Sequence, residues 1–270
     1  MSKIYFASDF HLGAPNPQES RQREQTILRW LEQVALDATA IYLVGDIFDF
    51  WFEYQTVVPK GAVRLLGKLA ELSDAGIDLH IFVGNHDIWM FDYFEQELGA
   101  TIHRQPLRVK LGDKHFFIAH GDGLGPGDYG YKRLKKVFTN RFCQWLFGWL
   151  HPDIGIRIAN KASHTSRTAQ VEPEYFLGAD KEWLLQYANQ KLRQAETTTT
   201  SSPVIDYFVF GHRHLPLDIL LQNKKSRYLN LGEWFSYNTY AVFDGNDLQL
   251  AAFERPDFDL TTTLHHHLYD

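Results

Sequence analysis

The feature that most constrains this chain is a set of polar residues at the ends of apolar stretches. Five stretches have the length and composition of buried strands: KIYFAS, AIYLVG, LHIFVG, KHFFIAH and VIDYFVF. The groups at their ends are Asp9-Phe10-His11, Gly45-Asp46-Ile47-Phe48-Asp49, Gly84-Asn85-His86-Asp87, His120-Gly121-Asp122 and Gly211-His212-Arg213-His214. In open α/β sheets, ligands bind beyond the carboxyl ends of the strands. We therefore expect these five groups to form one site.

The pattern between the strands predicts an α/β fold. Helical spacing of apolar residues predicts helices over residues 19–36, 62–75, 90–98, 132–150 and 180–195. The early alternation of strand and helix predicts βαβ units. Strands at 107–111 and 114–120 flank a Gly112-Asp113 turn. The end of the chain predicts antiparallel strands, with a turn at 244–246, that extend the first sheet or form a second one.

Composition excludes several classes of protein. The chain has 270 residues and a single cysteine, Cys143, so no intrachain disulfide can form. We expect no secretory signal, because the start MSKIYFASDFHLG lacks a basic segment followed by a long apolar run. No stretch approaches the roughly 20 apolar residues of a membrane-spanning helix. The net charge of −6 argues against general nucleic-acid binding.

The charge is unevenly distributed along the chain. Residues 131–170 contain eight basic residues and one acid, Asp153, so this segment carries +7 and the rest of the chain −13. The same segment contains a cluster of large apolar residues: Phe138, Phe142, Trp145, Leu146, Phe147 and Trp149. Such a helix can bind acyl chains or lie on an anionic membrane surface. The alternative is a helix packed on the domain with a solvated basic face, and nucleic acid is a weaker alternative because the basic region is small.

The residue types at the strand ends indicate a metal site. Carboxylates, imidazoles and an amide oxygen together suit Mn²⁺, Fe or Zn²⁺. Seven such ligands are too many for one tetrahedral ion, but they suit two ions that share a bridging carboxylate. Two ions about 3.5–4 Å apart can generate a hydroxide and hold a phosphoryl oxygen. No cysteine lies among these residues, which excludes a cysteine-type structural zinc site.

The order D-x-H, G-D-x-x-D, G-N-H-D, H-G-D, G-H-x-H resembles that of the calcineurin-like metallophosphoesterases, over essentially the whole chain. The resemblance implies a four-layer α/β/β/α sandwich and two divalent ions, with manganese as the expected metal. It implies that one ion is held by Asp9, His11, Asp46 and His214, and the other by Asp46, Asn85, His120 and His212, with Asp46 as the bridge. His86 would act on the substrate, and Asp87 would orient His86.

Within that superfamily, the chain is most similar to the UDP-2,3-diacylglucosamine pyrophosphatases of lipid A biosynthesis. The similarity lies in FASDFHLG, in HGDGLGPGDYGYKRL, in RIANKASHTSR and in the position of the basic insertion, which is a helical lid over acyl chains in that family. It implies one domain over residues 1–270 with a lid at 123–178. The substrate contacts that it implies are Asn85, His86, Asp128, Tyr131, Ser166 and His212.

The activity implied by this similarity is cleavage of UDP-2,3-diacylglucosamine to UMP and 2,3-diacylglucosamine 1-phosphate, by a cytoplasmic enzyme peripheral to the inner membrane. Two features depart from the family. Its best-known members have Asn-Arg where this chain has Asn85-His86, and its downstream lysine has no counterpart near residues 172–175. Asn-His is the pattern of general metallophosphoesterases, so the substrate is either the same or another nucleotide or phospholipid. A third alternative is a metal-binding scaffold that docks protein partners. The sequence does not determine the oligomeric state.

Overall fold

Four of the six strands of the first sheet come from βαβ units at the start of the chain. The structure is a computed structural model and describes residues 2–127, 129–159, 175–197 and 203–256. The six strands of this sheet lie in the order β11-β10-β1-β2-β3-β4. Their bounds are β1 (Lys3–Ala7), β2 (Ala38–Val44), β3 (Asp78–Phe82), β4 (Thr101–His103), β10 (Thr239–Phe243) and β11 (Leu248–Ala252). Strands β1 to β4 are parallel, which the βαβ pattern predicted for β1 to β3, and β10 joins β1 in antiparallel orientation.

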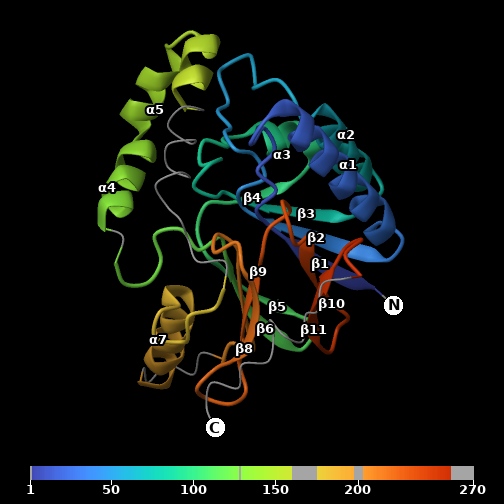
Figure 1. Ribbon diagram of the computed structural model, residues 1–270, viewed down its shortest axis with the longest axis vertical. Helices are drawn as coiled ribbons and strands as arrows, with labels where there is room; N and C mark the ends of the chain where they lie inside the picture. Colours follow the sequence, from blue (N-terminus) through green and yellow to red (C-terminus); the bar gives the residue numbers. More distant parts are fainter. Residues whose placement is uncertain (1, 128, 160–174, 198–202, 257–270) are drawn as a thin grey trace.

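Three helices connect the parallel strands and cover one face of this sheet (Figure 1). They are α1 (Pro17–Val34), α2 (Val63–Asp74) and α3 (Tyr93–Leu98). Helix α1 begins where the side chain of Asn16 accepts a hydrogen bond from the N–H of Glu19, with Pro17 in the first turn. Buried side chains of these helices, including Trp30 and Leu69, pack against the outer face of the sheet.

A second sheet of five strands packs against the first, in the order β5-β6-β7-β9-β8. Its strands are β5 (Leu107–Leu111), β6 (Lys114–Ala119), β7 (Tyr207–Phe210), β8 (Pro216–Leu220) and β9 (Arg227–Leu231). The Gly112-Asp113 turn joins β5 to β6 as predicted. The expectation of antiparallel strands late in the chain is correct for β8 with β9 and for β10 with β11, whereas β9 also pairs with the earlier strand β7 in parallel orientation.

The two sheets and their helices form four layers. Apolar residues of both inner faces, among them Phe6, Phe116 and Leu229, make one core between the sheets. Another core lies between the second sheet and α7 (Trp183–Thr197). The α/β/β/α sandwich implied by the sequence resemblance is therefore confirmed. No helix in the described part of the chain has the length and apolar character needed to cross a membrane.

The helix predicted over residues 132–150 is two helices, and this part of the prediction is wrong. Helix α4 (Tyr129–Phe138) ends before Thr139-Asn140, and α5 (Arg141–Gly148) begins after it. The side chain of Asn140 accepts hydrogen bonds from the N–H groups of Phe142 and Cys143, which caps a new helix. Residues 152–159 are also helical. Figure 1 shows α4 and α5 set off from the sandwich, beyond the strand ends.

Candidate metal centre

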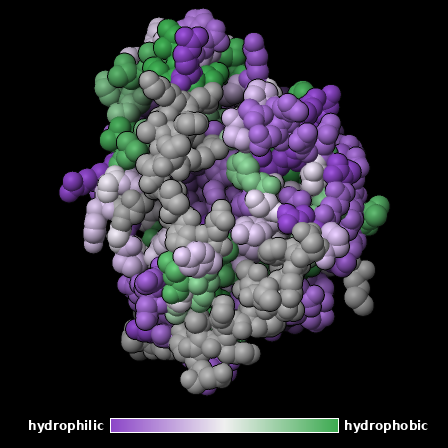
Figure 2. Space-filling model, in the orientation of Figure 1, coloured by the Kyte–Doolittle hydropathy of each residue, from purple (hydrophilic) through white to green (hydrophobic). Residues whose placement is uncertain are grey.

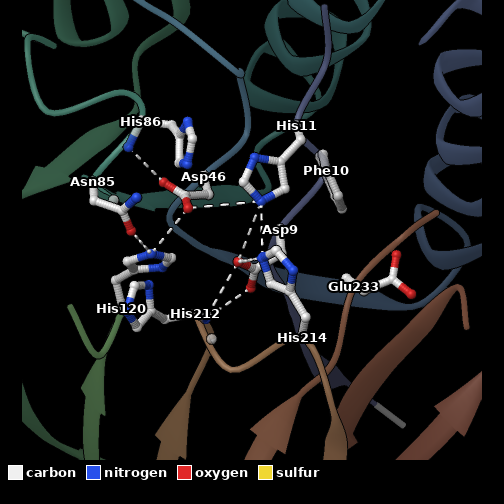
Figure 3. Close-up of polar contacts among 12 residues, drawn as sticks. Asp9, Phe10, His11, Asp46, Asn85, His86, His120, His212, His214 and Glu233 are labelled. Atoms are coloured by element: carbon white, nitrogen blue, oxygen red, sulfur yellow. Dashed lines mark hydrogen bonds and ion pairs between the residues drawn. The ribbon is translucent and has the colours of Figure 1, made fainter. Parts of the chain in front are cut away.

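The carboxyl ends of β1, β2 and β3 in one sheet meet those of β6 and β7 in the other. The residues that follow these strands converge there (Figure 3). They include all seven ligand-type residues expected from the sequence, Asp9, His11, Asp46, Asn85, His120, His212 and His214. In a single parallel sheet, only the strand ends of that sheet would lie together. In this protein, strand ends of two sheets contribute to one site.

One cluster joins the ends of β1, β2 and β7. Ligand atoms of Asp9, His11, Asp46 and His214 all lie within 4.8 Å of one another. The Nε2 atoms of His11 and His214 are 3.0 Å apart, and His214 Nε2 lies 3.2 Å from Asp9 Oδ1. His11 Nε2 is 3.7 Å from an oxygen of Asp9 and 3.7 Å from one of Asp46. Two carboxylates and two imidazoles at these separations can surround one divalent cation.

A second cluster shares Asp46 with the first. Ligand atoms of Asp46, His120 and His212 lie within 4.8 Å of one another. His120 Nε2 is 3.3 Å from Asp46 Oδ2 and 3.2 Å from the amide oxygen of Asn85. Asp46 is thus the one carboxylate common to both clusters among the described residues, the position that a bridging ligand requires.

The His120 ring is oriented in the way typical of a metal ligand. Its Nδ1 atom lies 2.8 Å from the carbonyl oxygen of Val44. A carbonyl only accepts, so Nδ1 must carry the proton and donate it, which turns Nε2 toward Asp46 and Asn85. A hydrogen bond on the far nitrogen fixes the ring and raises its basicity as a ligand. This contact, and not the residue types alone, indicates that the site fits a metal ion.

The backbone of the site is held in an unfavourable conformation. Nine non-glycine residues in the described part of the chain have positive φ. Five of them are ligand-type residues: Asp9, His11, Asp46, His212 and His214. Left-handed backbone at a non-glycine residue costs of order 1–3 kcal/mol and persists where the surrounding structure requires it. Ordinary loops do not concentrate strained backbone in this way, so the strain distinguishes the two clusters from them.

The glycines of the sequence motifs make room for these side chains. A Cβ atom on Gly45 would lie 2.5 Å from His120 Nδ1, and one on Gly211 would lie 2.7 Å from Asp9 Oδ2. A Cβ on Gly84 would lie 2.5 Å from the backbone N of Asp46, and closer still to its Oδ1. Real Cβ contacts are longer than 3.0 Å. The motif glycines are therefore needed because the ligand side chains pack directly on them.

Electrostatics keep the buried carboxylates ionised. Burial alone would raise the pKa of Asp9, but hydrogen bonds from His11 and His214 hold it well below its ordinary value. Burial likewise opposes ionisation of Asp46, and the charges of His120 and His86 outweigh it and lower the pKa. Two ionised carboxylates enclosed by protein favour a divalent cation.

The histidine pKa values shift in opposite directions. Burial lowers the pKa of His11 to about 3, and burial together with His120 lowers that of His212 to about 4, so both are neutral near pH 7 and ready to bind metal. Burial also opposes the charge on His120, but Asp46 raises its pKa to about 10. A cation binding between His120 and Asp46 would release that proton.

The contacts of Asp87 differ from the expected ones. Its two carboxylate oxygens accept hydrogen bonds from backbone N–H groups, at 2.7 Å from Gly84 and at 2.8 Å from Ile47. Burial and the charge of Asp46 raise the pKa of Asp87 to about 7. The contacts that the described residues make to Asp87 therefore tie the loop after β3 to the loop after β2, and they do not involve the His86 ring.

The carboxylate beside the His86 ring belongs to Asp49. His86 Nδ1 lies 3.4 Å from Asp49 Oδ1 and 3.1 Å from its backbone oxygen. Ligand atoms of His11, Asp49 and His86 also lie within 4.8 Å of one another. The signal for Asp49 was present in the sequence as the second aspartate of G-D-x-x-D. Sequence adjacency favoured Asp87, whereas packing places Asp49 next to the ring.

A cavity of about 430 Å³ opens beside the two clusters. On one side it is lined by Asn85, His86 and His212, and on the other by apolar residues of α4 and α5, including Leu134, Phe138 and Phe147. Tyr131 lines it too, and its hydroxyl donates a hydrogen bond to Asp122. The expected substrate residues Asn85, His86, Tyr131 and His212 thus share one cavity. Asp128 and Ser166 lie outside the described residues.

Comparison with known proteins identifies the family. Residues 2–216 match the family model of the calcineurin-like phosphoesterases, which is more than half of the chain. The chain belongs to the calcineurin-like phosphoesterases. It is therefore a metal-dependent hydrolase, and its His/Asp clusters are those of a divalent-metal site.

Curated relatives extend over nearly the whole chain. A "UDP-2,3-diacylglucosamine hydrolase" from Porphyromonas gingivalis is 39% identical over 94% of this chain and 98% of its own length. One of the same name from Proteus mirabilis is 28% identical over 92% of this chain and 98% of its own. Among solved structures, the phosphoesterase Yfce from E. coli matches with a TM-score of 0.45 and 14% identity, over 93% of each chain.

Proposed function

We propose that this phosphoesterase hydrolyses the pyrophosphate bond of UDP-2,3-diacylglucosamine to UMP and 2,3-diacylglucosamine 1-phosphate. The observation that carries the proposal is the apolar cavity that shares its wall with the metal centre. A nucleotide-linked lipid needs a polar hydrolytic centre and an apolar pocket within reach of each other. The cavity of about 430 Å³ has both, because His86, Phe138 and Phe147 all line it. The relatives that carry this substrate in their names support the choice.

Much of the apolar lining comes from the insertion. Leu134, Val137 and Phe138 come from α4, Phe147 from α5, and Ile158 from the following helical residues. Phe50 and Trp89 of the sandwich face them, and Trp89 Nε1 donates a hydrogen bond to the carbonyl of Phe138 that holds α4 in place. We propose that residues 123–178 form a lid over acyl chains and that the chain is a single domain over 1–270.

The metal centre would carry the chemistry. We propose that Asp9, His11, Asp46 and His214 hold one ion and that Asp46, Asn85, His120 and His212 hold the other, with manganese as the metal. Two divalent ions bound there would polarise the phosphoryl group and activate water. His86 lies at the boundary between the clusters and the cavity, where its imidazole can donate to a phosphoryl or leaving oxygen. Asp49 would hold that ring in place.

We further propose that the outer face of the lid lies on an anionic membrane surface, as expected for a lipid substrate. Phe142, Trp145 and Trp149 are 66%, 57% and 74% exposed. Figure 2 shows hydrophobic residues gathered where Figure 1 draws α4 and α5. Large exposed aromatic side chains near basic residues are typical of interfacial helices. Trp149→Asp should weaken sedimentation with phosphatidylglycerol vesicles, whereas Leu36→Asp, at an exposed apolar residue after α1, should not. Equal sedimentation of both variants would contradict the assignment.

The proposed activity is tested by a substrate comparison with manganese-loaded protein. UDP-2,3-diacylglucosamine, UDP-glucosamine without acyl chains, a phosphomonoester and bis(p-nitrophenyl) phosphate are compared by kcat/KM. We expect the acylated nucleotide to be the best substrate, because only it fills the apolar cavity. If another phosphoester is turned over far faster, then His86 in place of the family's arginine accompanies a different specificity. No turnover of any of them by metal-loaded protein would favour a docking scaffold instead.

A further inference from the structure

Helix α4 separates two cavities of opposite character. The face that carries Tyr131, Leu134 and Phe138 lines the apolar cavity described above. The opposite face carries Lys132, Arg133, Lys135 and Lys136 and lines a second cavity of about 650 Å³. The helical repeat produces this division, because residues three and four apart share a face while their neighbours point away. One helix therefore presents apolar groups to one space and cations to the other.

The second cavity has a large excess of positive charge. Besides the four cations of α4, its described lining contains Arg104, and its one carboxylate is that of Asp122. Asp122 is already engaged, since Lys135 Nζ lies 2.6 Å from its Oδ2 and the Tyr131 hydroxyl donates to the same oxygen. Arg133 and Lys136 have no ion-pair partner among the described residues. A concave surface with unbalanced cations focuses the field on an anionic ligand.

This cationic cavity also borders the metal centre. Its lining includes His120, Gly121 and Asp122, at the end of β6. The apolar cavity reaches the same centre through Asn85, His86 and His212, at the ends of β3 and β7. A molecule with one apolar end and one anionic end could therefore span the centre, with its scissile bond between the two cavities.

We propose that the cationic cavity is the subsite for the nucleoside monophosphate half of the substrate, the half released as UMP. This inference rests on the proposed function. Arg133 and Lys136 would hold the phosphate, as cations do in charge-assisted contacts. Tyr129 is 73% exposed in the same lining and offers a face on which a base can stack. The contacts of Asp122 with Lys135 and Tyr131 fix α4 against the end of β6 and so hold the cations in position.

The test removes Arg133 and Lys136 together in the variant R133A/K136A. Both residues are exposed, so the fold should be kept, which thermal unfolding checks. UMP binding to manganese-loaded protein is measured by calorimetry, and it should weaken about tenfold or more when two charge-assisted contacts to one phosphate are removed. The ratio of kcat/KM for UDP-2,3-diacylglucosamine to that for bis(p-nitrophenyl) phosphate should fall by a similar factor.

The matched control is Arg141→Ala, which removes a cation of the same lid outside both cavities. It should leave UMP affinity unchanged. Wild-type turnover of the nucleotide lipid with unchanged UMP affinity in R133A/K136A would overturn the subsite and leave the proposed function standing. Loss of UMP affinity in a protein that does not hydrolyse the lipid would support the subsite and reject that function. Loss of phosphatidylglycerol-vesicle binding without loss of UMP affinity would assign these cations to a membrane and overturn the proposal.

Discussion

Gly84→Ala adds one methyl group and should disable the metal centre. A Cβ at this position would lie 2.5 Å from the backbone N of Asp46 and closer still to its Oδ1, which also accepts a hydrogen bond from the N–H of His86 at 2.9 Å. No flexible chain end lies in the way, only backbone and a short carboxylate. Asp46 must therefore move, and it is the residue shared by both clusters.

The size of the effect follows from that displacement. Restoring an ordinary contact requires the Asp46 carboxylate to move by roughly 1 Å, and misplacement by that distance costs about 10²-fold in rate. Forcing a methyl group into packed structure also costs about 1–3 kcal/mol of stability. We therefore expect kcat for bis(p-nitrophenyl) phosphate to fall about 10²-fold, with fewer than two metal ions per chain.

The same substitution at Gly67 provides the control. Gly67 is exposed in α2, and a Cβ there would meet nothing within 4 Å. Alanine in a helix interior is favoured over glycine by about 0.5–1 kcal/mol, so Gly67→Ala should raise stability and leave kcat unchanged. Urea unfolding, steady-state kinetics and elemental analysis are measured on both variants. If Gly84→Ala keeps two ions per chain and kcat within a factor of two, the contact with Asp46 does not constrain the centre and the reasoning fails.

Four other outcomes are expected. Asp46→Ala should lose or weaken both metal ions by elemental analysis, and one ion per chain that is unchanged in the variant would exclude a dinuclear site. His86→Ala should lower kcat about 10²–10⁴-fold with metal content kept, the range for general acid catalysis, and loss of an ion would contradict its assignment to the substrate. Trp145→Asp with Trp149→Asp should damage hydrolysis of the acylated substrate far more than that of bis(p-nitrophenyl) phosphate, and equal damage would make α5 merely structural. Hydrolysis in ¹⁸O-labelled water should place the label in UMP, and label in the lipid phosphate would show attack at the other phosphorus.

The ligand-type residues were predictable from the sequence because their position depends on local rules. An apolar run of five to seven residues predicts a buried strand, and a polar residue at its end lies at the edge of the sheet wherever that strand is placed. The structure gives the reason for the motif glycines, because a Cβ atom at Gly45, Gly84 or Gly211 would collide with a ligand-type residue. The βαβ order predicted the parallel strands β1 to β3 in the same way.

Other features depend on contacts between distant segments, which spacing along the chain cannot specify. Asp87 is adjacent to His86 in sequence, yet the carboxylate beside the His86 ring comes from Asp49, 37 residues away. The pairing of β7 with β9 rather than β8 is likewise decided by the sheet as a whole. Only the tertiary structure shows which residues meet across the two sheets.

The segment that contains α4 and α5 illustrates both levels. Its amphipathic composition and its basic charge are properties of the sequence. Its break at Asn140 arises from a local cap that competes with the helical spacing on either side. The sequence alone does not determine which cavity each face of α4 lines. The helix period determines only that the apolar and basic residues point in different directions. Packing against the ends of β3, β6 and β7 places the apolar face over one side of the metal centre and the cationic face over the other.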